Sequence, residues 1–527
     1  MRIDSAQFNP AGRAVLRASP MEPDPGPPPL LPAHCQVTGT ILERTGMDGQ
    51  PYAIRFHVRL PADWNRRFLM QGGGGSNGEL GDALGGKAVG APAVARGYAV
   101  LSQDSGHDNA VNSAPERGGP TSFGFDPQAR ADYGNQSLPL SVTAAKGLVT
   151  AFYGAVPKHS YFAGCSKGGQ EGMMLAQRYP DLFDGILAVA PGMSLPKAAV
   201  AEAWDTQSFA MAAAKPLTPA SLAASFSDSD LSLVAKTILN VCDGDDGVID
   251  GMVGNYRACT RQKVEPALRQ TVCADTKHPS CLASAQVDAL VRVHDGVRNS
   301  RGEPLYASFP WDAGWSDRGW RVWKIGSADG RIPAINVMMG APSLAMVFTT
   351  PPTLPTPGLA GALDYAMGFD FDRDAPKIFA TGGAFTRSAW TDIGARSPDI
   401  SAFTRRGGKM IVPHGVSDPV FSVNDTVDWW EEVDQRSKGQ AAATVRVFPV
   451  PGMTHCSGGP ATDRFDGLTA LESWVEHGRA PDHLLGTSGP LTPWPGRQRP
   501  ICAYPTVARY KGRGDIERAD SFTCSAP

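Results

Sequence analysis

Two stretches of the chain place a serine between glycines, an arrangement in which a serine hydroxyl can act as a nucleophile. Gly164–Gly168 (GCSKG) lies between an apolar strand-like run and a helix-prone run. A serine at such a junction exposes its hydroxyl above a parallel sheet, and the helix N-terminus can stabilise a negatively charged oxygen. Ser76 also lies in such a pentapeptide, but glycines and a proline follow it, so no helix can begin there. The context therefore predicts Ser166 as the nucleophile.

A nucleophilic serine needs a base and a carboxylate that orients the base. In sheets of this kind both residues follow later strands, in the order Ser, Asp, His. The strand-like run 409–412 leads to Asp418, and the run 445–450 leads to His455. A lone histidine in a loop is usually a surface or structural residue. The assignment therefore depends on the positions of Asp418 and His455, which follow two successive strands in the expected order. We predict His455 as the base and Asp418 as its partner.

The strand-like run 68–70 ends in a glycine-rich loop, 71–78. Such a loop after an early strand can turn a backbone N–H toward an oxyanion, as the partner of the N–H that follows the nucleophile. The alternative is a flexible loop without a catalytic role. Its position relative to Ser166 favours the oxyanion interpretation.

The chain has nine cysteines, and two of them adjoin the predicted catalytic residues. Cys165 precedes Ser166 and Cys456 follows His455, so a disulfide between them would hold nucleophile and base in register. No C-x₂-C pair typical of metal thiolates occurs. Three further pairs bracket short loops, namely Cys242 with Cys259, Cys273 with Cys281, and Cys502 with Cys524.

Disulfides indicate an oxidising compartment, so we expect a secreted or periplasmic protein. The alternative is a cytosolic protein with reduced, buried thiols. Cys35 is the cysteine left without a partner. The first residues, MRIDSAQFNPAG, contain no apolar core and are not a signal peptide as they stand.

A second group of chemically capable residues is the acidic loop that begins at Cys242. Carboxylates at Asp243, Asp246 and Asp250 alternate with glycines, which suits a hard oxygen-ligand site for calcium. The carbonyls of Val248 and Met252 are available to complete such a site. The loop is not an EF-hand because it lacks the bidentate glutamate at position 12. The alternative is an acidic turn that binds no metal.

The net charge and the distribution of apolar residues bear on the partners of this protein. The net charge is −3 and no basic run occurs, so nothing in the charge pattern indicates a nucleic-acid partner. No apolar stretch is long enough to span a membrane. We expect a monomer that acts on a small molecule.

The elements that must position these residues alternate between strand-like and helix-prone runs, which predicts an α/β fold with a doubly wound, mostly parallel sheet. The alternation stops near 193 and resumes near 401. A chain of 527 residues is long for one core, which favours a catalytic domain with a large insertion. We predict a first catalytic part at 1–192, an inserted lid at 193–400 and a second catalytic part at 401–527.

With these residues in view, the chain resembles the tannase and feruloyl esterase family of α/β-hydrolases. Cys165-Ser166, Asp418 and His455-Cys456 are similar to the family's serine triad bridged by a disulfide, and the loop 242–259 is similar to its lid calcium site. The resemblance extends over nearly the whole chain, through segments such as PYAIRFHVRLPADWN, GCSKGGQEGMMLAQRYP, GGKMIVPHGVSD and PGMTHCSGGPATDRFD.

The resemblance implies an esterase for esters of aromatic acids, with a structural Ca²⁺ ion on the five lid residues named above. It implies an oxyanion hole formed by the N–H groups of Gly75 and Lys167. It also implies the four disulfides 165–456, 242–259, 273–281 and 502–524. Cys35 would pair with a cysteine further upstream that this sequence lacks, so we expect that a natural N-terminus with an export signal is missing.

The resemblance further implies an aromatic pocket lined by lid and sheet residues. These are Leu195, Ile335, Met339, Ser343, His414 and Phe421. A family member that hydrolyses a terephthalate monoester holds the free carboxylate with a lid arginine. Ile335 occupies that position here, and an isoleucine cannot supply the paired donors that bind a carboxylate. We therefore predict a weakened preference for such a monoester, unless another arginine such as Arg331 compensates.

Three alternatives to this prediction stay open. Efficient hydrolysis of the terephthalate monoester itself is the first. A peptidase or acyltransferase that uses the same triad is the second. The third is a calcium-dependent module that binds phenolics or carbohydrate without catalysis, which a fluorophosphonate would not label at Ser166.

Overall fold

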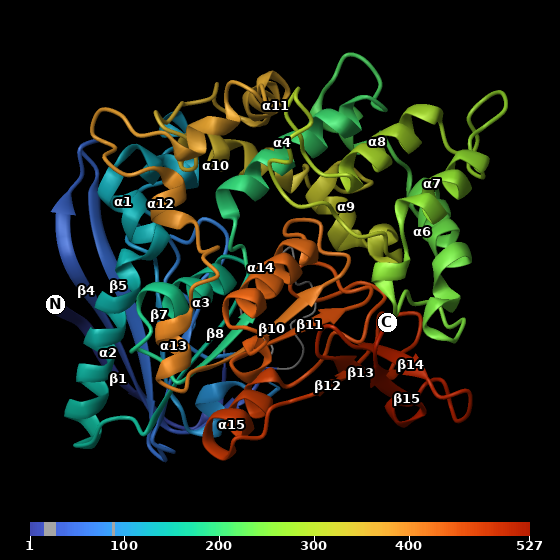
Figure 1. The fold of residues 1–527 in the computed structure, drawn as a ribbon. Coiled ribbons are helices and arrows are strands. Elements are labelled where there is room, and N and C mark those ends of the chain that lie inside the picture. The colour runs from blue at the N-terminus through green and yellow to red at the C-terminus, as the bar shows by residue number, and fades with distance from the viewer. Residues whose placement is uncertain (15–27, 87–89) are drawn as a thin grey trace.

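The computed structural model describes residues 1–14, 28–86 and 90–527, and its centre is a nine-stranded sheet (Figure 1). The strands are β1 (Arg2–Asn9), β4 (His34–Thr45), β5 (Pro51–Pro61), β6 (Arg67–Gln71), β7 (Ala99–Gln103), β8 (His159–Cys165), β9 (Gly185–Val189), β10 (Lys409–Gly415) and β11 (Val445–Val450). Their order is β1-β4-β5-β7-β6-β8-β9-β10-β11. The strands from β7 to β11 in this order are parallel, and β5, β4 and β1 extend the sheet in antiparallel pairs.

Helices cover both faces of the parallel strands, which explains why successive residues of these strands are buried rather than alternately buried and exposed. Phe68 and Met70 of β6 pack in one core with the first group of helices, whereas Leu69 packs in the other core with the second group. The first group is α2 (Ser137–Tyr153), α3 (Lys167–Arg178) and α14 (Val423–Arg436), and the second is η1 (Ala93–Arg96) and α15 (Gly467–His477). The predicted doubly wound, mostly parallel sheet is confirmed.

The edge strand β1 has no counterpart in the sequence-based prediction. Almost all of its side chains are exposed, so it carries no apolar pattern that could indicate a strand. It is held by its backbone pairing with β4, in which Phe8 lies opposite Cys35. Such pairing depends on a neighbouring strand that the local sequence does not reveal.

Between β9 and β10 the chain, fully described there, forms helices and connecting loops. The α-helices are α4 (Leu195–Ala210), α5 (Pro219–Ala223), α6 (Asp228–Cys242), α7 (Arg261–Gln270), α8 (Ser284–His294), α9 (Arg318–Lys324), α10 (Ala341–Met346), α11 (Leu359–Gly368), α12 (Ala389–Ile393) and α13 (Ser401–Arg405). Figure 1 shows α4, α8, α9, α10 and α11 gathered on one side of the sheet. The division of the chain at 192 and 400 stays a prediction.

The C-terminal part adds two small antiparallel sheets, coloured red in Figure 1. One pairs β12 (His483–Thr487) with β13 (Gln498–Cys502), and the other pairs β14 (Val507–Tyr510) with β15 (Phe522–Ser525). Arg497 and Arg499 lie on or next to β13 and contact Asp250, so this part of the chain packs against the acidic loop of the lid.

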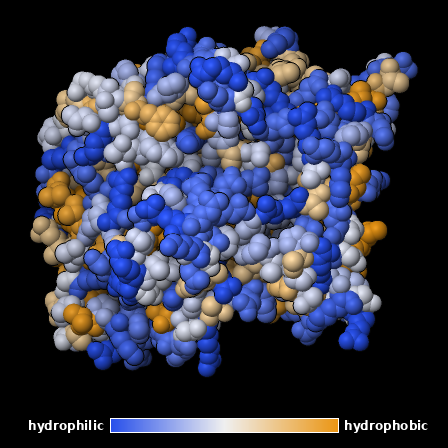
Figure 2. Space-filling model, in the orientation of Figure 1, coloured by the Kyte–Doolittle hydropathy of each residue, from blue (hydrophilic) through white to orange (hydrophobic). Residues whose placement is uncertain are grey.

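The surface gives no sign of a large apolar patch on the face that Figure 2 shows. That face is mostly hydrophilic, and its hydrophobic residues form small, separate groups. Among the helices of residues 1–14, 28–86 and 90–527, none combines the length and the apolar character that crossing a bilayer requires.

Candidate active site

Ser166 lies on the turn between β8 and α3, as the sequence predicts. Its φ of 65° and ψ of −121° are uncommon for a residue with a side chain. Two glycines make this turn possible. A Cβ at Gly164 would lie 2.8 Å from the backbone of Gly168, and one at Gly168 would lie 2.7 Å from the carbonyl oxygen of Gly73. The glycines therefore allow the close backbone approaches that such a nucleophile turn requires.

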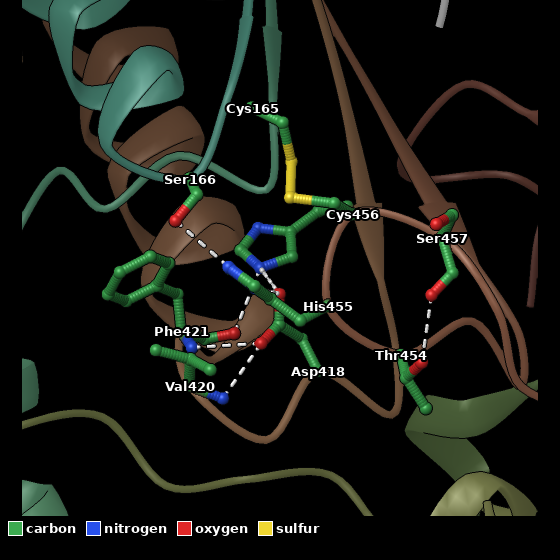
Figure 3. Close-up of a disulfide and its surroundings, with 10 residues drawn as sticks. Cys165, Ser166, Asp418, Val420, Phe421, Thr454, His455, Cys456 and Ser457 are labelled. Carbon is green, nitrogen blue, oxygen red and sulfur yellow. Dashed lines mark hydrogen bonds and ion pairs between the residues drawn. A yellow bond between two sulfur atoms is a disulfide. The ribbon is translucent and has the colours of Figure 1, made fainter. Parts of the chain in front are cut away.

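The three predicted catalytic side chains meet in space although they are far apart in sequence (Figure 3). The Ser166 hydroxyl lies 2.9 Å from His455 Nε2, and His455 Nδ1 lies 2.9 Å from Asp418 Oδ2. With Nδ1–H donating to the carboxylate, Nε2 accepts the hydroxyl proton. This geometry is that of a nucleophile, a base and an orienting acid.

Asp418 is buried, yet its surroundings favour the charged form. The N–H groups of Val420 and Phe421 donate to Oδ1 at 2.8 Å and 3.0 Å. Burial alone would raise the pKa of Asp418, but His455 and His414 beside it hold that pKa well below its usual range. The carboxylate therefore stays ionised and can stabilise a positively charged His455.

The Cys165–Cys456 disulfide is present, with its Cα atoms 6.0 Å apart (Figure 3). It joins the residue before Ser166 to the residue after His455. The other three predicted pairs are also present, namely Cys242–Cys259, Cys273–Cys281 and Cys502–Cys524. The predicted disulfides are thus confirmed, and Cys35 is a free, partly buried cysteine on β4.

Asp312, a buried carboxylate between α8 and α9, connects the loops that carry Asp418 and His455. Its Oδ2 accepts hydrogen bonds from the Ser417 hydroxyl at 2.9 Å and from the Gly452 N–H at 2.7 Å. Ser417 immediately precedes Asp418, and Gly452 lies three residues before His455. Burial raises the pKa of Asp312 to about 6. Sequence reasoning missed this residue because no motif marks it.

The two predicted oxyanion donors lie on the elements that the sequence indicates. Lys167 is the first residue of α3, directly after Ser166. Gly75 has a φ of 56°, and the Tyr133 hydroxyl donates to its carbonyl oxygen at 3.1 Å. A Cβ at Gly75 would lie 3.6 Å from the sulfur of Met339, so a lid residue lies next to the glycine loop.

The predicted pocket residues are largely gathered in one apolar cluster. Ile335, Leu195, Met339 and Phe421 all belong to it, and the Phe421 ring lies 5.4 Å from the His455 ring. Ser343 lies nearby in the chain on α10 and is buried.

Two further residues bear on the pocket prediction. His414 is fully buried behind Asp418, and its nitrogens contact the Thr426 hydroxyl and the Phe421 carbonyl oxygen. Arg331, which the sequence suggests as an alternative carboxylate-binding arginine, has a side chain that is 86% exposed and pairs with Asp329.

Trp323 is a neighbour of the triad that sequence reasoning missed. Its ring lies 5.2 Å from the His455 ring, and its buried indole N–H has no hydrogen-bond partner. It belongs to the same apolar cluster as Ile335 and Phe421. The sequence between 193 and 400 is rich in tryptophan, but this composition alone does not indicate which tryptophan lies beside the triad.

The acidic loop is a buried, polar structure closed by the Cys242–Cys259 disulfide. Asp243 accepts the N–H groups of Asp250 and Gly251 at 3.0 Å and 2.8 Å, and Asp250 pairs with Arg499. Burial, together with the charges of Asp250 and Asp243, raises the pKa of Asp246 to about 7. Within the described part of the chain, no three His, Cys, Asp or Glu side chains are arranged closely enough to form a metal site.

The donor chemistry of this loop nevertheless fits a hard cation. Asp243, Asp246 and Asp250 are all buried and offer only oxygen donors, which calcium prefers. A Cβ at Gly254 would lie 2.0 Å from an oxygen of Asp246, so a glycine there leaves room for that carboxylate.

Comparison with known proteins settles the family. A sequence model described as "Tannase and feruloyl esterase" matches residues 35–525. The chain belongs to the tannase and feruloyl esterase family. A mono(2-hydroxyethyl) terephthalate hydrolase from Piscinibacter sakaiensis is 47% identical over 94% of this chain and 85% of its own length. A probable feruloyl esterase from Arthroderma benhamiae is 28% identical over 97% of this chain and 89% of its own.

The fold of this family member agrees with solved structures. The crystal structure of feruloyl esterase B from Aspergillus oryzae matches with a TM-score of 0.75 and 23% identity, over 99% of this chain and 96% of that one. The expected α/β-hydrolase fold is therefore confirmed, and family membership places the chain among the carboxylic ester hydrolases.

The disulfide next to the triad generates a prediction. The double variant Cys165→Ser/Cys456→Ser should lose about 4 kcal/mol of stability, because this disulfide closes a very long loop. Its kcat should fall about 10- to 100-fold, with a smaller change in KM, because nucleophile and base lose their shared anchor. Thermal unfolding and steady-state rates on an aromatic methyl ester measure both effects.

The matched control is Cys273→Ser/Cys281→Ser, which removes a disulfide from a loop that is mostly exposed. It should leave kcat within about twofold of the wild type, since effects at distant sites are usually independent. An equal loss of kcat in both double variants would contradict a specific role for the first disulfide.

Proposed function

We propose that this family member hydrolyses esters of aromatic acids through Ser166, His455 and Asp418. The observation that carries the proposal is the chain of two 2.9 Å contacts from the Ser166 hydroxyl through His455 to the ionised Asp418. The small aromatic ester is the expected substrate because an apolar cluster with Phe421 and Trp323 adjoins the imidazole.

In the first half of the reaction, Ser166 Oγ attacks the ester carbonyl carbon while His455 Nε2 takes the hydroxyl proton. Asp418 stabilises the resulting imidazolium. The N–H groups of Gly75 and Lys167 hold the tetrahedral oxyanion, a contribution of roughly 3–4 kcal/mol per donor in comparable sites. His455 then protonates the departing alcohol, which leaves Ser166 acylated.

In the second half, His455 deprotonates a water molecule that attacks the acyl-enzyme. The tetrahedral intermediate uses the same two N–H donors. Its collapse releases the aromatic acid and returns the proton from His455 to Ser166. The cycle is balanced by one water consumed for each ester hydrolysed.

We further propose that the pocket prefers neutral aromatic esters over a terephthalate monoester. Ile335 is buried in the apolar cluster and cannot pair with a carboxylate. Arg331 is exposed and paired with Asp329, so it offers no substitute. The terephthalate monoester stays the alternative substrate, which the 47% identity to a protein named for that activity favours.

The acidic loop is the proposed position of a structural calcium ion. Asp243, Asp246 and Asp250, with the carbonyls of Val248 and Met252, would hold it. The ion would bring the carboxylates together and stabilise the loop against the C-terminal sheets. No step of ester hydrolysis passes through it. Four disulfides also support a secreted or periplasmic location.

The catalytic assignment predicts that Ser166→Ala lowers kcat by about 10⁶-fold, to the background rate, because the nucleophile is lost. Initial rates on methyl ferulate and methyl gallate measure this effect. The control is Ser280→Ala, which removes a hydroxyl from an exposed lid loop and should keep the wild-type rate. Residual turnover by the Ser166 variant well above background would contradict the assignment, and so would labelling of a different serine by a fluorophosphonate.

The pocket assignment predicts a gain of function. Ile335→Arg should raise kcat/KM on mono(2-hydroxyethyl) terephthalate relative to methyl ferulate by about 10-fold, the effect of one hydrogen bond to a charged group. Ile335→Met is the neutral control and should leave the ratio unchanged. If the wild type already prefers the terephthalate monoester by a large factor, another group binds the carboxylate and the pocket assignment is wrong.

The calcium assignment predicts that a chelator lowers the unfolding temperature. Calcium at 100 times its Kd would stabilise the fold by about 2.7 kcal/mol, and EDTA would remove this contribution. Thermal unfolding in calcium and in EDTA, with disulfides intact, measures the difference. Asp246→Asn should abolish the difference, whereas Asp275→Asn on an exposed loop should retain it. Equal unfolding temperatures of the wild type in calcium and in EDTA would contradict the assignment.

A further inference from the structure

The glycine-rich loop Gly72–Gly78 contacts the nucleophile helix through one fully buried carboxylate, Glu171 of α3. Glu171 Oε2 accepts the N–H of Gly73 at 3.1 Å, and Oε1 accepts the side-chain amide of Asn77 at 3.1 Å. Gly73 and Asn77 each lie two residues from Gly75. One carboxylate therefore holds the loop on both sides of its predicted oxyanion donor.

The counter-ion of Glu171, Lys167, contacts two residues that hold the loop, Glu171 and Tyr133. Lys167 is 1% exposed, and its ammonium donates to Glu171 Oε1 at 3.1 Å. The same ammonium lies 4.6 Å from the centre of the Tyr133 ring, and the Tyr133 hydroxyl donates to the Gly75 carbonyl oxygen. The side chain of Lys167 is thus linked to the loop through Glu171 and Tyr133, while its backbone N–H is the second predicted donor.

The loop needs such support because its own residues supply little. Five of its seven positions are glycine, which gives the unfolded loop a large conformational entropy. Backbone bonds hold its ends, from Gly72 N–H to Ala163 and from Gly78 N–H to Asp104. Within the loop, the Asn77 N–H donates to the Gly74 carbonyl oxygen at 2.9 Å, and the Asn77 side-chain amide also donates to the Ser105 hydroxyl. Glu171 and Tyr133 add contacts at Gly73, Gly75 and Asn77. An oxyanion donor contributes fully only when it is oriented before the reaction begins.

We infer that Glu171, paired with Lys167, is a positioning residue that orients the Gly75 N–H toward the oxyanion. This inference rests on the proposed esterase function. In the described part of the chain, Glu171 hydrogen-bonds to Gly73, Asn77, Ser105 and Lys167 and to none of the triad side chains, so it would act through the loop. Charge matters because a neutral side chain at 171 cannot accept hydrogen bonds from both sides of the loop and also compensate the buried ammonium.

The test compares three variants on methyl ferulate. Glu171→Gln keeps the shape of the side chain but turns one acceptor into a donor. Lys167→Met removes the ammonium. The double variant Glu171→Gln/Lys167→Met leaves neither charge of the pair buried, so a loss of rate in it cannot be attributed to an unpaired buried charge that destabilises the fold. Glu79→Gln, which removes an exposed carboxylate one residue beyond the loop, is the matched control. Rates are expressed per site that a fluorophosphonate labels at completion, so unfolded protein does not count.

We expect Glu171→Gln and the double variant to lose about 10- to 100-fold in kcat, with KM within about threefold, since removing a donor completely costs about 10²–10³-fold. The inhibition constant of phenylboronic acid, which forms a tetrahedral anion on serine, should weaken by a similar factor. That of the neutral ligand benzamide should stay unchanged. A merely structural role would weaken both inhibitors or neither.

The inference is overturned if the double variant keeps kcat within twofold of the wild type, or if benzamide binding weakens as much as boronate binding. These outcomes differ from failure of the proposed function, in which the wild-type protein itself would not hydrolyse any of the aromatic esters. The Glu79→Gln control should retain wild-type values throughout.

Discussion

The Cys165–Cys456 disulfide joins the nucleophile turn at the end of β8 to the loop after β11, and the geometry of the site depends on this covalent constraint. The sheet alone places the two loops at the same edge, because parallel strands end on the same side. It does not determine the distance between a hydroxyl and an imidazole to within a hydrogen bond. The disulfide removes much of the freedom that the two loops would otherwise have.

The loop of Asp418, the predicted acid, has a second constraint, which comes from the segment between β9 and β10. Asp312 holds the segments of Ser417 and Gly452 with one carboxylate oxygen, so the loops of Asp418 and His455 share a buried anchor. Trp323, also from this segment, packs its ring against the imidazole. The segment between β9 and β10 therefore contacts the loops that carry Asp418 and His455 from two directions.

The two predicted oxyanion donors show the same principle on the other side of Ser166. A flexible glycine loop suits close approach to substrate, yet the same flexibility opposes a fixed donor. The buried Glu171–Lys167 pair lies where it can fix the glycine loop without adding a side chain to the loop itself. The glycine turn and the glycine loop thus carry little side-chain bulk near Ser166, whereas the rings of Trp323 and Phe421 pack beside His455.

The sequence by itself predicted Ser166 as the nucleophile, the order of the triad and the alternating α/β core, and cysteine spacing together with the family resemblance indicated the four disulfides. These features are local patterns, such as a glycine turn before a helix, or a consistent order along the chain. The roles of Trp323, Asp312 and Glu171, and the exposed edge strand β1, were decided only by the tertiary structure. Each depends on a partner distant in the chain or on backbone pairing, and such contacts leave no periodicity or spacing in the sequence around them.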